Sequence, residues 1–304
     1  MLHRASIYYK QVRLLMDVIP FVAKEEVFAL KGGTAINLFV KDLPRLSVDI
    51  DLTYLPIEPR DESLKRISQA FERIAMDIER FLKGSRVYKI GKQDELLKLQ
   101  VERFNVRIKI EASPVLRGTV KIPSLRIVTP KVEEEFGFVG MLVLHTDDLY
   151  AGKICAALDR QHPRDFFDIK GLLDSGGISE ELMDVFIVYL ISSNQSVSKL
   201  LAPNFIDLSE VFKRQFIGMT LERISLEEIL EIRKKLVFTI HSKLKDRHKE
   251  FLISFKEGRP NWSLLPFEGI ENLPSIKWKM LNLAKMESAK RKEAVKKLAD
   301  VLKL

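Results

Sequence analysis

The sequence predicts an α+β fold, with an N-terminal mixed sheet and its helices followed by a C-terminal helical domain. Two observations favour this fold. Apolar segments of strand length, some of them alternating with polar residues, lie in the first half of the chain. Beyond about residue 178, apolar residues recur instead at three- and four-residue intervals, as in helices. We therefore expect two domains, residues 1–145 and residues 146–304.

The first predicted elements surround a pair of glycines. Residues 27–31 are mainly apolar and end at this pair, so we expect a strand followed by a tight turn. A short helix over residues 34–40 should come next, which places the glycine amides at a helix N-terminus, a natural position for an anion. A helix over residues 7–19 precedes these elements, and a strand over residues 48–54 follows them.

The middle of the chain predicts a helix and a hairpin. Residues 61–83 carry apolar side chains at helical spacing, after two prolines that end the preceding strand. Residues 96–103 and 106–113 read as strands joined by only two residues, as in a β-hairpin. The remaining expected elements are a strand at 141–145 and helices at 147–160, 164–173, 187–201, 226–255 and 281–302.

Two aspartates on the strand over residues 48–54 carry the strongest chemical signal. Alternation places Asp49 and Asp51 on one face and Ile50 and Leu52 on the other. Two carboxylates on one face repel each other unless a cation binds there. Mg²⁺ suits such ligands and is usually held by one or two carboxylates together with substrate phosphates. Because glycine lets backbone amides approach a phosphate closely, the glycine turn and the carboxylate pair together indicate nucleotide chemistry.

Three sequence blocks extend this pattern along the chain. They are Lys31-Gly32-Gly33-Thr34-Ala35 with Arg45-x-Ser47-x-Asp49-x-Asp51, then Asp148-Leu149-Tyr150-Ala151-Gly152-Lys153 with Pro163-Arg164-Asp165-Phe166-Phe167-Asp168, and Leu273-Pro274-Ser275-Ile276-Lys277-Trp278. In this order, the blocks resemble the nucleotidyltransferase superfamily and, more narrowly, the AbiEii/AbiGii toxin family.

The resemblance implies an enzyme that transfers a nucleoside monophosphate from an NTP to an acceptor hydroxyl and releases pyrophosphate. It also implies one or two Mg²⁺ ions and a toxin of a toxin–antitoxin or phage-defence system, with a cognate antitoxin as partner. For some relatives the acceptor is the tRNA 3′ end. Two other functions remain open: modification of a protein hydroxyl, and nucleotide binding for regulation without turnover.

Five residues are the predicted catalytic set. Asp49 and Asp51 are expected to bind the metal. The resemblance places Lys153 at the family's functional lysine, near the triphosphate, and best matches Asp168 to its functional aspartate. Glu111 lies on the polar face of its predicted strand and is the candidate third carboxylate. It could be a metal ligand, a general base or an ordinary charged edge residue.

Six further residues are assigned to nucleotide binding: Gly32, Gly33, Thr34, Arg45, Ser47 and Asp165. The glycine amides would approach a phosphate. The Thr34 hydroxyl would either bind a phosphate or cap the following helix. Arg45 and Ser47 would either touch phosphate or fix their loop. Asp165 would contact the nucleotide, help to place Lys153, cap its helix or pair with a neighbouring arginine.

Composition limits the possible partners and compartment. The net charge is +8 and the isoelectric point about 9.3, which suits a polyanionic partner such as RNA. No apolar run approaches the roughly 18 residues of a membrane span, so we expect no membrane partner. The single cysteine is consistent with the reducing cytoplasm, where we expect the protein.

Overall fold

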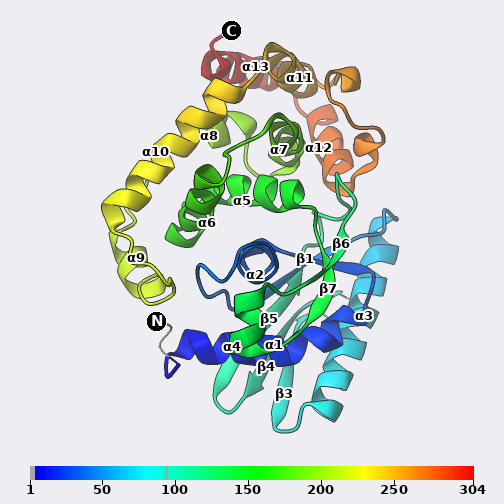
Figure 1. Ribbon diagram of the computed structural model, residues 1–304. Helices are drawn as coiled ribbons and strands as arrows, with labels where there is room; N and C mark the ends of the chain where they lie inside the picture. The colour runs from blue at the N-terminus through cyan, green and yellow to red at the C-terminus, as the bar shows by residue number, and fades with distance from the viewer. Residues whose placement is uncertain (1–3, 93–94) are drawn as a thin grey trace. The chain divides into compact units, whose positions relative to one another are not determined.

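The computed structural model describes residues 4–92 and 95–304 of the chain, and seven of its segments form one sheet (Figure 1). The strands lie in the order β3-β4-β5-β2-β1-β7-β6. Their bounds are β1 (Phe28–Lys31), β2 (Asp49–Tyr54), β3 (Ser85–Lys92), β4 (Glu95–Arg103), β5 (Val106–Ala112), β6 (Ser124–Ile127) and β7 (Gly140–Val143).

The sheet is mixed. Strand β1 runs parallel to β7 and β2 runs parallel to β5, whereas the other neighbouring pairs are antiparallel. This confirms the predicted α+β class with a mixed sheet. The predicted hairpin is β4–β5, and its two connecting residues, Phe104 and Asn105, have φ of 49° and 60°. Positive φ at both positions is what a tight two-residue hairpin turn requires.

One face of the sheet forms the core of this part of the chain. Helix α1 (Ile7–Ala23) packs on β2, β5 and β7, and α3 (Arg60–Phe81) packs on β3 and β4. Leu30, Ile50 and Ile110 are fully buried on this face, and strand register places them in adjacent rows. Burying each such side chain contributes about 1.5–3 kcal/mol, so the apolar alternation of these strands holds α1 and α3 in place.

The opposite face is polar. The register pairs Lys31 of β1 with Asp51 of β2, Asp51 with Glu111 of β5, and Glu111 with Lys98 of β4. Residues that are paired in register point to the same side of a sheet, so these four side chains form one row across four strands. The predicted carboxylate strand therefore presents its acids on the face that α1 and α3 leave uncovered.

The chain divides into two compact units, residues 1–149 with 217–223 and residues 150–216 with 224–304. The first unit holds the whole sheet with α1, α3 and three short helices, α2 (Gly32–Thr34), η1 (Ala35–Val40) and α4 (Pro130–Phe136). Residues 217–223 belong to it because they run beside residues 44–46, where Met219 accepts a hydrogen bond from the Leu46 amide at 2.7 Å.

The regular elements of the second unit are helices. Helix α5 (Thr146–Arg160) enters it from the first unit, and α7 (Glu180–Ser192) is buried along most of its length. The other elements are α6 (Pro163–Asp174), α8 (Val197–Leu201), α9 (Ser209–Gln215), α10 (Leu226–Lys243), α11 (Asp246–Lys256), η2 (Trp262–Leu264), η3 (Ile270–Asn272), α12 (Pro274–Ala284) and α13 (Ser288–Leu302).

A buried histidine joins α11 to α7 in this unit. The His248 Nε2 lies 2.8 Å from a carboxylate oxygen of Asp184, and its Nδ1 accepts a hydrogen bond from the Lys245 amide. Because Nδ1 is an acceptor here, the proton of the neutral ring is on Nε2 and is donated to Asp184. Burial lowers the pKa of His248, and Asp184 opposes this shift. The contact therefore fixes a neutral histidine between two helices.

Three helices predicted as continuous are wrong, because each is two helices. The segment over 187–201 contains the end of α7 and all of α8, which are separated where the Ser196 side chain caps α8. The segment over 226–255 breaks at Leu244, whose backbone is extended, and the segment over 281–302 contains the end of α12 and all of α13. Apolar periodicity continues through such turns, whereas helix ends are decided by local capping contacts.

None of the helices among residues 4–92 and 95–304 is both long and apolar enough to cross a membrane.

Candidate functional site

The turn after β1 requires glycine at its first position. Gly32 has φ of 75°, a left-handed conformation that side chains other than glycine rarely adopt. A Cβ atom on Gly32 would also lie 2.5 Å from Oδ2 of Asp51, well inside the contact distance of the two atoms. The predicted phosphate turn therefore lies directly against the predicted metal-binding strand.

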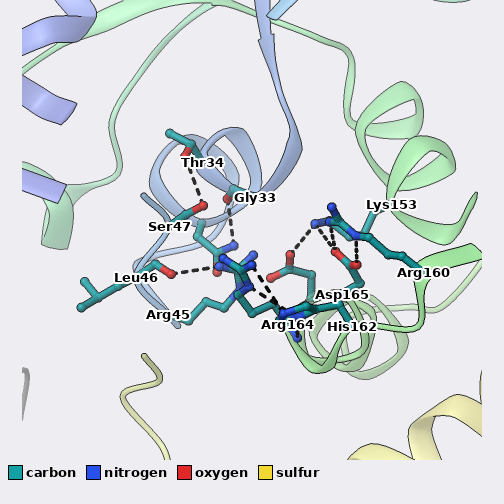
Figure 2. A network of polar contacts seen from close by, with 12 residues as sticks. Gly33, Thr34, Arg45, Leu46, Ser47, Lys153, Arg160, His162, Arg164 and Asp165 are labelled. Carbon is teal, nitrogen blue, oxygen red and sulfur yellow. Dashed lines mark hydrogen bonds and ion pairs between the residues drawn. The ribbon is translucent and has the colours of Figure 1, made fainter. Parts of the chain in front are cut away.

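The second glycine of the turn lies against Arg45 and Ser47. A Cβ atom on Gly33 would be 2.6 Å from Nη2 of Arg45 and 2.7 Å from the Ser47 hydroxyl. Arg45 is only 2% exposed, and its Nη1 donates a hydrogen bond of 2.9 Å to the Leu46 carbonyl (Figure 2). These contacts bring together three of the residues predicted to bind nucleotide, within the first unit.

Thr34 links the turn to the start of β2 through hydrogen bonds. Its hydroxyl donates a hydrogen bond of 2.5 Å to the Asp49 carbonyl. It also lies 3.1 Å from the Ser47 hydroxyl (Figure 2). Asn37 adds a bond from its side-chain amide to the Gly33 carbonyl at 2.9 Å. The helix predicted over 34–40 begins earlier, at Gly32, and continues as a π-helix over Ala35–Val40. π-Helical turns are frequent at functional sites.

Asp49, Asp51 and Glu111 lie on one face of neighbouring strands. Asp51 is the register partner of Glu111, and Asp49 is the register partner of Lys109. The Glu111 carboxylate forms an ion pair with Lys98 at 3.1 Å. Within residues 4–92 and 95–304, no group of three His, Cys, Asp or Glu side chains is arranged to hold a metal by itself.

Lys31 is a candidate site residue that the sequence interpretation did not select. It is the last residue of β1 and the register partner of Asp51. Burial lowers the pKa of Lys31, while the nearby carboxylates of Asp51 and Glu111 raise it. The sequence held a signal for Lys31, because this residue ends the strand that leads into the predicted phosphate turn.

The second unit contains a buried charge cluster around Lys153. The Nζ of Lys153 lies 2.9 Å from Oδ1 of Asp165 and 2.9 Å from Oδ2 of Asp168. Lys153 comes from α5 and both aspartates come from the first two turns of α6, where their spacing places them on one helix face. The structure thus brings together the three residues predicted from the second sequence block.

Asp165 is held by two cations. Arg160 donates two hydrogen bonds to its carboxylate, at 2.6 Å and 2.8 Å, in addition to the contact with Lys153 (Figure 2). Burial by itself would raise the pKa of Asp165, but Lys153 and Arg160 outweigh burial and hold it well below its ordinary value. Of the alternatives for Asp165, pairing with a neighbouring arginine and holding Lys153 in place both have contacts in the structure.

A buried tyrosine hydroxyl lies near the same cluster. Tyr150 is on α5, three residues before Lys153, and is 3% exposed. Its hydroxyl makes no hydrogen bond with any residue that the structure describes. Burial and the charge of Asp168 both raise the pKa of Tyr150, so the hydroxyl is protonated at neutral pH. A buried hydroxyl of this kind costs free energy of folding unless it donates a hydrogen bond to another group.

Comparisons with known proteins identify the family of the chain. The family model described as "Nucleotidyl transferase AbiEii toxin, Type IV TA system" matches residues 13–280. The chain belongs to this family. This AbiEii-family toxin is therefore a nucleotidyltransferase of a type IV toxin–antitoxin system. The match spans both units, from α1 to α12.

Among solved structures, the toxin is similar to MenT4, a nucleotidyltransferase toxin from Mycobacterium tuberculosis H37Rv. The two are 13% identical with a TM-score of 0.45, and the likeness covers 100% of this chain and 99% of that chain. None of the curated proteins compared with the toxin matches it.

The residues of β2 fit a divalent metal of the kind that nucleotidyltransferases use. Asp49 and Asp51 offer hard oxygen ligands from one strand face, and the bare backbone of Gly32 lies against Asp51. Since protein side chains alone do not complete a three-ligand set in the described residues, phosphate oxygens of the substrate would supply the rest.

Proposed function

We propose that this toxin transfers a nucleoside monophosphate from an NTP to the hydroxyl of an RNA acceptor, with Asp49 and Asp51 as ligands of one or two Mg²⁺ ions. The acceptor oxygen attacks the α-phosphorus, its proton leaves, and pyrophosphate is released. The observation that carries this proposal is the contact of the Gly32 backbone with the carboxylate of Asp51. This contact supports the proposal because it joins the turn proposed to bind phosphate to the strand proposed to bind the metal.

The turn and its neighbours would bind the triphosphate. The amides of Gly32 and Gly33 offer donors at the start of a helical segment, where anions are favoured. Arg45 and Ser47 support the second glycine, and Thr34 fixes the turn to β2. Lys31, beside Asp51, supplies a cation that offsets negative charge on the phosphates and on the carboxylates. Bound Mg²⁺ would stabilise the charge that develops on the phosphate oxygens.

Glu111 is proposed as the general base that takes the proton of the acceptor hydroxyl. Its register position beside Asp51 places it next to the metal ligands. The Glu111 carboxylate also pairs with Lys98 at 3.1 Å, which holds it on the polar face of the sheet.

In the second unit, Lys153 and Asp168 are proposed as further catalytic residues. Lys153 supplies a buried cation, and such a fixed charge favours negative charge that develops in phosphoryl transfer. Asp165 would orient Lys153, since it also binds Arg160 through both oxygens. Asp168 and the hydroxyl of Tyr150 would face the nucleotide.

The acceptor is proposed to be a tRNA 3′ end. The net charge of +8 favours a polyanion, and the family is that of a toxin, whose target must be essential to the cell. We also propose a cytoplasmic location and a cognate antitoxin as the partner that restrains the enzyme. The alternatives are a protein hydroxyl as acceptor and a regulatory nucleotide-binding role without turnover.

The test uses the full chain with Mg²⁺, total tRNA and each of the four NTPs in turn, labelled at the α-phosphate. The variant Asp49→Asn/Asp51→Asn removes both metal ligands with little change in volume. The matched control is Asp61→Asn, which removes an exposed carboxylate from α3. We expect label on tRNA with one NTP for the wild type and the control, and none for the double variant.

Other outcomes separate the alternatives. Label on the protein or on a co-purified protein, and none on tRNA, would assign the acceptor to the protein class. NTP binding without transfer to any acceptor would favour the regulatory role. Equal transfer by the Asp49→Asn/Asp51→Asn variant would refute the metal-site assignment.

A further inference from the structure

Strands β3, β4 and β5 continue the polar sheet face beyond the carboxylates. One row runs from Asp49 through Lys109 and Gln100 to Tyr88, and these residues are register partners on four adjacent strands. The adjacent rows place Arg86 beside Glu102 and Arg107, and Ile90 beside Lys98 and Glu111. We call this surface the β3–β5 face: Arg86, Tyr88, Ile90, Lys98, Gln100, Glu102, Arg107, Lys109 and Glu111.

The β3–β5 face is exposed. Tyr88 is 42% and Ile90 44% exposed, and Arg86 and Lys109 are exposed as well. On the other side of β4, Leu99 and Val101 are fully buried, and α3 packs on this strand. A large aromatic and a large aliphatic side chain are therefore accessible on the open side of the sheet.

The charges of this face favour an anion. It carries four cations, Arg86, Lys98, Arg107 and Lys109, against the two carboxylates of Glu102 and Glu111. Two of the cations are neutralised, because Lys98 pairs with Glu111 at 3.1 Å and Arg107 pairs with Glu102 at 2.5 Å. Arg86 and Lys109 have no carboxylate partner among the residues that the structure describes. Both can therefore bind phosphates.

We propose that the β3–β5 face binds the single-stranded end of the RNA acceptor, with a base stacked on Tyr88 and phosphates paired with Arg86 and Lys109. This rests on the function proposed above and adds where its acceptor lies. Single-stranded nucleic acid is bound by a combination of backbone-tracking cations and aromatic side chains on which bases stack. Sheet faces with exposed aromatic residues bind two or three unpaired nucleotides in this way.

Continuity with the carboxylates supports this choice of occupant. Tyr88 and Asp49 lie in one row, three strand spacings apart, which is about 14 Å for strands separated by about 4.8 Å. Lys109 and Gln100 lie between them in the same row. A single RNA strand that lies along this row can therefore stack a base on Tyr88 and present its terminal hydroxyl at the carboxylates of β2. An RNA duplex presents no unstacked bases and would not use Tyr88.

The test measures binding apart from transfer. The probe is a fluorescently labelled single-stranded RNA of twelve nucleotides, with the same RNA in a blunt duplex for comparison, and binding is followed by anisotropy without NTP. The variants are Tyr88→Ala and Arg86→Glu, which lie farthest from Asp49 on this face. Tyr88→Phe keeps the ring, and Lys65→Glu, an exposed position on α3, matches the charge reversal.

We expect Tyr88→Ala to weaken single-strand binding by roughly 5- to 100-fold, the range for one stacked base. Tyr88→Phe and Lys65→Glu should bind like the wild type. Arg86→Glu should also weaken binding. It should reduce the slope of log K against log[salt] by about the amount expected for one phosphate contact. In transfer assays, Tyr88→Ala should raise the KM for RNA and leave the KM for NTP unchanged.

The outcomes distinguish this inference from the proposed function. If Tyr88→Ala and Arg86→Glu bind and modify RNA like the wild type, the β3–β5 face is not the acceptor surface, although the transfer activity stands. If the wild type binds RNA through Tyr88 but transfers no label to it, the surface stands and the proposed reaction fails. If the wild type binds no single-stranded RNA, the inference is overturned, and label on a protein would identify the acceptor instead.

Discussion

Asp51 and Gly32 are in contact at a distance that only a glycine at position 32 allows. A Cβ at this position would lie 2.5 Å from Oδ2 of Asp51, and Lys31, the residue before it, is the register partner of Asp51. The glycine turn and strand β2 therefore depend on each other for their positions. A change in the turn must displace either the backbone that would bind phosphate or the carboxylate that would bind metal.

Gly32→Ala is expected to lower the free energy of unfolding by more than the left-handed backbone conformation alone would. That conformation costs an alanine about 1–2 kcal/mol, and the contact with Asp51 adds to it at position 32. The matched control is Gly177→Ala, because Gly177 also has φ of 75° but has nothing within 4 Å of its Cβ position. Chemical unfolding should show the larger loss for Gly32→Ala, and only this variant should lose NTP binding. Equal losses in both variants would contradict the close contact.

Lys153→Met is expected to destabilise the second unit strongly. It leaves Asp165 and Asp168 buried without their shared cation, and removing one partner of a buried ion pair costs about 3–5 kcal/mol. Lys170→Met is the matched control, since Lys170 pairs with Asp174 at the surface of α6, where such a pair contributes about 0.3–0.5 kcal/mol. The free energy of unfolding from urea titration measures both.

A double-mutant cycle separates the pair from the rest of the cluster. If Lys153 and Asp168 are coupled, Lys153→Met/Asp168→Asn should lose less stability than the two single variants added together, by roughly 0.5–3 kcal/mol. Additive losses would show that Lys153 is held mainly by Asp165.

Local sequence patterns predicted the parts of the site that depend on one strand or one helix. Alternation placed Asp49 and Asp51 on one face, and helical spacing placed Asp165 and Asp168 together, because both periodicities are properties of the chain itself. Glu111 was also correctly expected on a polar strand face beside Asp51, although its role remains a prediction.

The parts that depend on neighbours could not be predicted in this way. Strand order decides that Lys31 lies beside Asp51, and only the fold brings residues 217–223 beside Arg45. Strand β3 was not predicted, because it is an edge strand whose exposed side carries Arg86 and Tyr88 and gives little apolar alternation. Strand β6 has only four residues and is mostly exposed, so it also lacks the pattern of a half-buried strand.

The neutral, buried His248 predicts a loss of stability as the pH falls. Burial lowers its folded-state pKa, Arg247 and Lys245 lower it further, and Asp184 opposes them. In the unfolded chain, the ring takes up a proton near pH 6.5, so the unfolded state binds more protons below that pH. The contribution of His248 is therefore fully present above about pH 6.5 and is lost as the pH falls from there through the lowered folded-state value.

His248→Gln tests this dependence, because glutamine cannot take up a proton in this range. The melting temperature of the wild type should fall between pH 7.5 and pH 5.5 by more than that of the variant. At pH 7.5 the variant should be less stable by about 1–3 kcal/mol, since the Lys245 amide and Asp184 lose a partner. His241→Gln is the control on α10. A pH dependence unchanged in His248→Gln would show that other groups titrate.

Tyr150→Phe tests whether the Tyr150 hydroxyl forms a hydrogen bond with the bound nucleotide. The hydroxyl is buried without a hydrogen bond among the described residues, so its removal should leave the free energy of unfolding unchanged or raise it by up to about 1–3 kcal/mol. Tyr54→Phe is the matched control, because the Tyr54 hydroxyl bonds Glu58 at 3.2 Å and its loss should destabilise the chain. If the Tyr150 hydroxyl contacts the nucleotide, Tyr150→Phe should nevertheless raise the KM for NTP several-fold. A stable variant with unchanged KM and kcat would remove Tyr150 from the site, and a destabilised one would show that its hydroxyl already has a partner in the folded chain.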